Sequence, residues 1–150
     1  MSCLGDHNNL VSRHVTERII TKLMSSLEER GVSLAGLLLK VAMVLPGNTC
    51  HEVAQSTVET LHKSVPPGIG GVVFLSGGQS DDDSMKNLNA ISRYNANLGR
   101  QMRLSFSYGR ALQQSSLKKW KGSNANVEQA QEELVKRCKQ ASMASLGLLG

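Results

Sequence analysis

Three short apolar segments alternate along this chain with longer stretches that have helical periodicity. The segments span 36–44, 71–75 and 103–107, and Pro46-Gly47 and Ser76–Gly78 end the first two. The first two are rich in leucine, valine and phenylalanine and are expected to be fully buried strands. Strands that alternate with helices predict parallel pairing through right-handed crossovers. The sequence therefore predicts an α/β protein with a three-stranded parallel sheet.

The helical stretches are indicated by apolar spacing and by the residues at their ends. In the first stretch, apolar residues recur every four positions from Val15 to Leu27, and Gly31 follows as a stop signal. Ser80 with Asp83 three residues later marks the start of the helix after the second strand, where carboxylates suit the positive end of the helix dipole. The expected helices span 15–30, 51–63, 80–92, 111–120 and 126–144.

Composition limits the partners that this chain is expected to bind. A length of 150 residues is that of one ordinary domain. Only 3% of the residues are aromatic, which disfavours a stacking surface for nucleic acid, and the apolar runs are too short to span a membrane. The formal net charge of +5 would attract a small anionic substrate. We therefore expect no nucleic acid and no membrane among its partners.

The cysteines and histidines predict neither a disulfide framework nor a metal site. Cys3, Cys50 and Cys138 are odd in number and widely spaced, with no CxxC pair, and the four histidines form no metal-ligand motif. The first residues also lack the pattern of a secretion signal. These observations favour a reducing compartment and predict a cytoplasmic protein.

Two basic clusters lie in the last third of the chain, within 118–121 and 136–139. Glu128, Glu132 and Glu133 are interspersed near them. Mixed charges of this kind are typical of solvated helix faces, so the clusters are not predicted to form a binding site.

A lysine interrupts the first apolar segment. Lys40 lies between three leucines and Val41, and burial there would remove water from its amine and favour the neutral form. A neutral lysine amine is a nucleophile that forms a Schiff base with a ketone or aldehyde. In the alternative interpretation, Lys40 simply extends its amine into water at the end of a buried strand. The segment alone favours this second interpretation.

The other two strands also end in residues suited to binding. These residues are Ser76, Gly77 and Gly78 after the second strand, and Ser107, Gly109 and Arg110 after the third. Glycine amides approach phosphate oxygens closely, and an arginine binds phosphate through two parallel hydrogen bonds. Because the carboxyl ends of parallel strands meet at one edge, these residues and Lys40 predict a site for a phosphorylated carbonyl compound. The aspartates at 81–83 oppose an anion at their own helix, so we place the phosphate on the 76–78 amides and Arg110.

The same segments resemble the class I fructose-bisphosphate aldolases. The matching motifs are FLSGGQS at 74–80, LSFSYGRALQ at 104–113, LLK at 38–40 and parts of 126–137. The similarity runs from about Gly5 to Gly147 and so covers nearly the whole chain. It implies a partial (β/α)8 TIM barrel, in which residues 1–150 are the C-terminal half, a single incomplete domain with the last three parallel strands and their helices.

The resemblance also assigns roles. Lys40 would be the Schiff-base lysine, Ser76, Gly77 and Gly78 the phosphate-binding loop, and Ser107, Gly109 and Arg110 the remaining substrate and phosphate contacts. No metal and no organic cofactor is needed for this chemistry. The substrate would be a sugar phosphate, and full-length relatives are expected to be homo-oligomers.

The implied reaction is the reversible aldol cleavage of fructose 1,6-bisphosphate to dihydroxyacetone phosphate and glyceraldehyde 3-phosphate, in glycolysis and gluconeogenesis. The glutamate acid/base of the family has no counterpart in this chain, and Val41-Ala42 replaces the family's Pro-Asn. We therefore expect weak or absent cleavage by this chain alone. Two alternatives stay open: a catalytically impaired paralogue that binds a sugar phosphate or a partner protein, and a Schiff-base lyase for another phosphorylated sugar.

Overall fold

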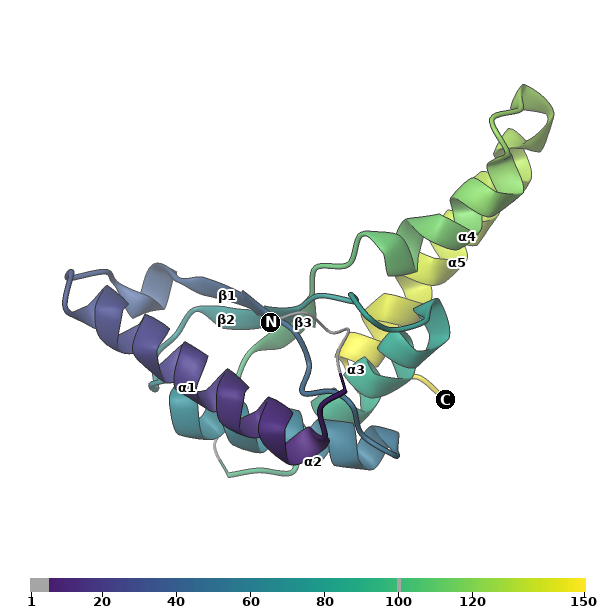
Figure 1. Ribbon diagram of the computed structural model, residues 1–150. Helices are drawn as coiled ribbons and strands as arrows, with labels where there is room; N and C mark the ends of the chain where they lie inside the picture. Colours follow the sequence, from purple (N-terminus) through teal and green to yellow (C-terminus); the bar gives the residue numbers. More distant parts are fainter. Residues whose placement is uncertain (1–5, 100) are drawn as a thin grey trace.

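A three-stranded parallel sheet lies at the centre of the computed structural model, which describes residues 6–99 and 101–150. The strands are β1 (Leu38–Val41), β2 (Gly71–Phe74) and β3 (Leu104–Phe106), in the order β1-β2-β3. In this register Lys40 lies opposite Val73, and Val73 lies opposite Ser105. The predicted α/β fold with a parallel sheet is confirmed (Figure 1).

All five predicted helices are present. They are α1 (Asn9–Glu28), α2 (Cys50–Ser64), α3 (Asp81–Ala96), α4 (Arg110–Trp120) and α5 (Val127–Ser145), with short 3-10 helices η1 (Leu34–Gly36) and η2 (Asn124–Asn126). The first helix begins earlier than predicted because the Asn8 side chain caps it by accepting a hydrogen bond from the Val11 amide. Gly31 follows α1 with a positive φ of 68°, as its stop signal predicts.

The helices pack on one face of the sheet. Leu39, Val72 and Phe74 point into a buried cluster that includes Ile20 of α1 and Val58 of α2. Figure 1 shows α1 and α2 on the same side of the strands. This cluster is the hydrophobic core of the described residues, and its burial provides most of the driving force for folding.

The opposite face of β1 is open, and one strand prediction is therefore wrong. The segment 36–44 was expected to be a fully buried strand, whereas β1 has four residues, of which Leu38 and Lys40 are exposed. Leu38 has 62% of its surface exposed. The physical reason is that, in the described part of the chain, helices cover only the face that carries Leu39. The central strand β2 is buried throughout, as predicted.

The last two helices form a hairpin that projects from the rest of the molecule (Figure 1). α4 and α5 pack along each other, and the turn after α4 uses Lys121 and Gly122, both with positive φ. α5 also packs against α3, where Ala141 and Ala144 are completely buried. None of the helices within 6–99 and 101–150 combines the length and apolar character that spanning a membrane requires.

Candidate functional site

The carboxyl ends of the three strands meet at one edge of the sheet. Strand pairing continues just beyond the strands, since the Leu75 amide donates to the Val41 carbonyl at 3.0 Å and the Ser107 amide donates to the Phe74 carbonyl at 2.8 Å. The segments that follow β2 and β3 therefore leave the sheet side by side. These are the two segments for which the sequence predicts phosphate binding.

The turn after β2 is held by local hydrogen bonds. The Gln79 amide donates to the carbonyl of Ser76, a buried residue, at 3.3 Å. Gly78 has a positive φ of 78°, a conformation that strains any residue with a side chain. The Gln79 side chain accepts a hydrogen bond from the side-chain Nδ2 of Asn87 at 2.8 Å, which ties the turn to α3. The 76–78 backbone is thereby fixed at the strand edge.

Gly77 lies directly beside the Arg110 side chain. A β-carbon on Gly77 would be 4.0 Å from Nη2 of Arg110 and 3.2 Å from Cδ1 of Leu75. The structure therefore brings together two of the predicted residues, one from the turn after β2 and one from the start of α4. A phosphate group accepts hydrogen bonds from guanidinium groups and from backbone amides, and both kinds of donor are present here.

The N-terminus of α4 adds a feature that the sequence prediction missed. Gly109 is its N-cap and Arg110 its first residue, with no capping side chain and no acidic residue in the first turn. In α3, by contrast, Ser80 caps the helix and Asp81–Asp83 fill its first turn. The first amides of α4 therefore favour an anion, and α3 disfavours one. The lack of any acidic residue within 107–113 was the available signal.

The cap of α3 follows the predicted pattern. The Ser80 hydroxyl accepts from the Asp83 amide at 3.0 Å and donates to the Asp83 carboxylate at 2.7 Å. This exchange uses the Asp83 carboxylate for the cap itself, leaving Asp81 and Asp82 to other partners.

Lys40 lies at the same edge on the neighbouring strand, with an exposed side chain. It lines a hollow of about 230 Å³ together with Thr16 of α1 and Ala42. Lys40 lies on the open face of β1, so the leucine and valine side chains around it in the sequence do not bury it. The alternative interpretation, an amine extended into water, fits this exposure.

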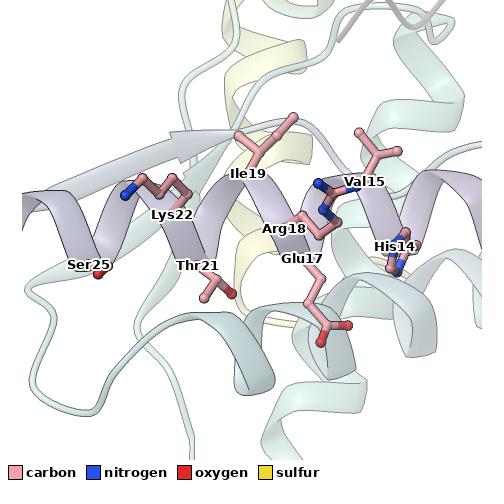
Figure 2. A pocket seen from close by; sticks show the side chains of 8 residues that line it. All are labelled: His14, Val15, Glu17, Arg18, Ile19, Thr21, Lys22 and Ser25. Carbon is pink, nitrogen blue, oxygen red and sulfur yellow. The ribbon is translucent and has the colours of Figure 1, made fainter.

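One other hollow lies beside the strand ends, and another lies along α1. One of about 530 Å³ is lined by Gly78 and by Leu45 from the segment after β1. A wider one, of about 820 Å³, follows the outer side of α1, and Figure 2 shows Arg18, Ile19 and Lys22 on that single helix. Because all of its lining residues belong to α1, it is not part of the candidate site. Within 6–99 and 101–150, no group of three or more His, Cys, Asp and Glu residues is placed to hold a metal ion.

Tyr108 anchors the segment after β3. Its side chain is buried, and its hydroxyl donates to the Ser84 carbonyl of α3 at 2.9 Å. Burial raises the pKa of Tyr108, because a phenolate would lose its hydration there. Tyr108 thus fixes the position of its neighbours Ser107 and Gly109 relative to α3; both are exposed.

Tyr108→Phe is expected to lower the free energy of unfolding by about 1 kcal/mol, since it removes one buried hydrogen bond and keeps the ring. Urea unfolding monitored by circular dichroism measures this change. Tyr108→Ala, which also removes the ring, should cost more. Equal effects of the two variants would contradict a distinct contribution from the hydroxyl.

Comparison with known proteins gives a consistent result. The model of the glycolytic family described as fructose-bisphosphate aldolase class-I matches residues 2–149. Fructose-bisphosphate aldolase C from Pan troglodytes is 44% identical over 149 residues, which cover 95% of this chain and 40% of that protein. Fructose-bisphosphate aldolase C-A from Danio rerio shows the same identity and the same coverage.

A solved structure shares the fold. It is the fructose-bisphosphate aldolase of Plasmodium falciparum, in a complex with TRAP and a small-molecule inhibitor. The TM-score is 0.92 and the sequence identity 41%, and the match covers 99% of this chain and 44% of that one. The chain therefore spans less than half the length of the proteins that it matches.

Proposed function

Because this chain belongs to the class-I fructose-bisphosphate aldolase family, we propose that it carries the phosphate-binding and imine-forming part of an aldolase reaction. The expected fold is confirmed: the chain is a partial (β/α)8 TIM barrel with three parallel strands and their helices. The substrate class that we propose is a ketose phosphate such as fructose 1,6-bisphosphate.

The proximity of Arg110 to Gly77 carries this proposal. A phosphate group placed between them would accept hydrogen bonds from the guanidinium and from the amides of 76–78. The uncapped start of α4, next to Arg110, adds positive potential at the same place. Ser107 and Gly109 lie in the same segment and are proposed as further substrate contacts.

Lys40 supplies the nucleophile. Its amine adds to the substrate ketone carbon, and loss of water gives a protonated imine. The imine draws electrons as the bond between the third and fourth carbons breaks, so that glyceraldehyde 3-phosphate leaves and an enamine of dihydroxyacetone phosphate stays on Lys40. The proton transfers need a general acid and base, which we assign to no residue of this chain.

A second candidate function is sugar-phosphate binding without turnover. It is favoured by the exposure of Lys40 on the open face of β1. In that case the Arg110 site would still bind the phosphate group, and no covalent adduct would form. The homo-oligomeric state of full-length relatives and the cytoplasmic location stay predictions.

Borohydride reduction in the presence of dihydroxyacetone phosphate tests the proposal. We expect the intact mass of the protein to rise by one reduced adduct, and inorganic phosphate to decrease the yield by competition. Phosphate binding without an adduct would support the second candidate. Neither an adduct nor phosphate binding would contradict both.

Arg110→Gln is expected to weaken the binding of dihydroxyacetone phosphate about tenfold or more, since it removes a charge-assisted pair of hydrogen bonds. Isothermal titration calorimetry measures the change. Arg18→Gln is the matched control, because Arg18 is an exposed residue of α1 (Figure 2) and its replacement removes the same charge from a helix that carries neither Gly77 nor Arg110. Equal losses in the two variants would mean that only net charge attracts the ligand.

A further inference from the structure

Arg137 of α5 is not a solvated charge, although its basic cluster predicts one. Only 12% of its side chain is exposed. Nη1 lies 2.7 Å from the Asp82 carboxylate, Nη2 lies 3.7 Å from Asp81, and Nε lies 3.5 Å from Glu133. One guanidinium on α5 therefore faces two of the three aspartates that begin α3.

The contacts of Arg137 extend to α4. The Ser115 hydroxyl of α4 donates to the Asp81 carboxylate at 2.8 Å and accepts from Nη2 of Arg137 at 3.4 Å. Glu133 also pairs with Lys119 of α4 at 2.7 Å. Arg137 thus joins the N-terminus of α3 to α4, the helix whose first residue is Arg110.

These contacts balance the charges of the carboxylates. The hydrogen bond and positive charge of Arg137 hold the pKa of Asp82 below its usual range. Lys119, through a hydrogen bond and its charge, likewise lowers the pKa of the buried Glu133. The negative charges of Asp82 and Glu133 are therefore stabilised by the positive charges of Arg137 and Lys119.

The aspartates follow the candidate phosphate turn closely in the sequence, so their charge affects whether an anion can bind there. Asp81 is only three residues after Gly78, the last residue of the candidate phosphate turn. Uncompensated carboxylates so close would repel a phosphate group, because like charges at short range cost free energy. The Asp83 carboxylate accepts a hydrogen bond from the neutral Ser80 hydroxyl, whereas Asp81 and Asp82 are the two aspartates of this turn that face Arg137.

We propose that Arg137 is a positioning residue for the phosphate site: it offsets part of the negative charge of Asp81 and Asp82 and holds the start of α3 against α4, the helix that begins at Arg110. This inference rests on the proposed function. It assigns no contact between Arg137 and the substrate. A charge 55 residues away in sequence from Asp82 thereby permits an anion to bind beside an acidic helix start.

Inorganic phosphate is the probe for this role. Arg137→Met is expected to weaken its binding about five- to tenfold at low ionic strength, and less at high ionic strength, because salt screens exposed charges. Adding Asp81→Asn and Asp82→Asn to Arg137→Met should return the affinity to about that of the wild type, since the two carboxylates of α3 that Arg137 contacted are then replaced by neutral amides. A purely structural role of Arg137 would lower the free energy of unfolding and would not be rescued by the two asparagines.

A second variant keeps the test decisive if Arg137→Met does not fold. Asp81→Asn with Asp82→Asn in the wild-type background removes two negative charges and leaves Glu133 as the acidic partner of Arg137, so phosphate binding should tighten. If the wild type binds phosphate and this double variant, or Arg137→Met, binds it with the same affinity, the inference is overturned and the proposed function is not. No phosphate binding by the wild type would overturn the proposed function itself.

Discussion

Lys40→Met is expected to abolish the borohydride-stable adduct with dihydroxyacetone phosphate. The imine forms between a primary amine and the ketone carbon of the substrate. A methionine side chain has a similar length but no nucleophilic nitrogen. We expect the adduct to be lost completely, because no atom of the methionine side chain can form the bond to the ketone carbon. Intact-mass spectrometry after reduction, followed by peptide mapping of the wild type, measures both the yield and the modified residue.

Lys22→Met is the matched control for this experiment. Lys22 is exposed on the outer side of α1 (Figure 2), so its replacement removes one amine and one charge without touching the strand ends. The control should retain the full adduct yield. An adduct of wild-type yield in Lys40→Met would show that another amine reacts and would remove Lys40 from the proposed mechanism.

Phe74→Ala is expected to lower the free energy of unfolding by about 3–5 kcal/mol. Phe74 lies in the central strand and is completely buried, so the substitution leaves a cavity in the core. Domains of this size are stable by about 5–15 kcal/mol in total, so the variant should be largely unfolded in mild denaturant. The midpoint of urea unfolding gives the measurement.

Leu38→Ala is the control on the adjacent strand. Leu38 is also a large apolar residue of the sheet, but it is 62% exposed on the open face. Its replacement should change the free energy of unfolding by no more than about 0.5 kcal/mol. Comparable losses for Leu38→Ala and Phe74→Ala would show that the open face of β1 is covered in solution.

The parts of the fold that depend on local signals were predictable from sequence. Ser80 and Asp83 predict the start of α3 because a capping side chain acts within three residues. The β-branched run of β2 predicts a buried strand, and β2 is central. β1 was wrongly expected to be buried, because the burial of a leucine-rich segment depends on whether other elements cover both of its faces.

The candidate site was predictable only as a set of strand ends. The parallel topology implies that the residues after β2 and β3 meet, but the proximity of the Arg110 side chain to Gly77 depends on side-chain packing. The surroundings of Arg137 could not be predicted, because its aspartate partners belong to a helix more than 50 residues earlier in the chain. The roles of these residues in binding and catalysis stay predictions.

The position of Lys40 on an edge strand matters for a second reason, which does not depend on the reactivity of its amine. β1 is a terminal strand of the described sheet, with β2 on one side. Backbone groups along such an edge invite strands of other chains to add, and a charged lysine in the strand is a common way to discourage that addition. We therefore expect Lys40 to disfavour the addition of another strand to β1, whatever the role of its amine.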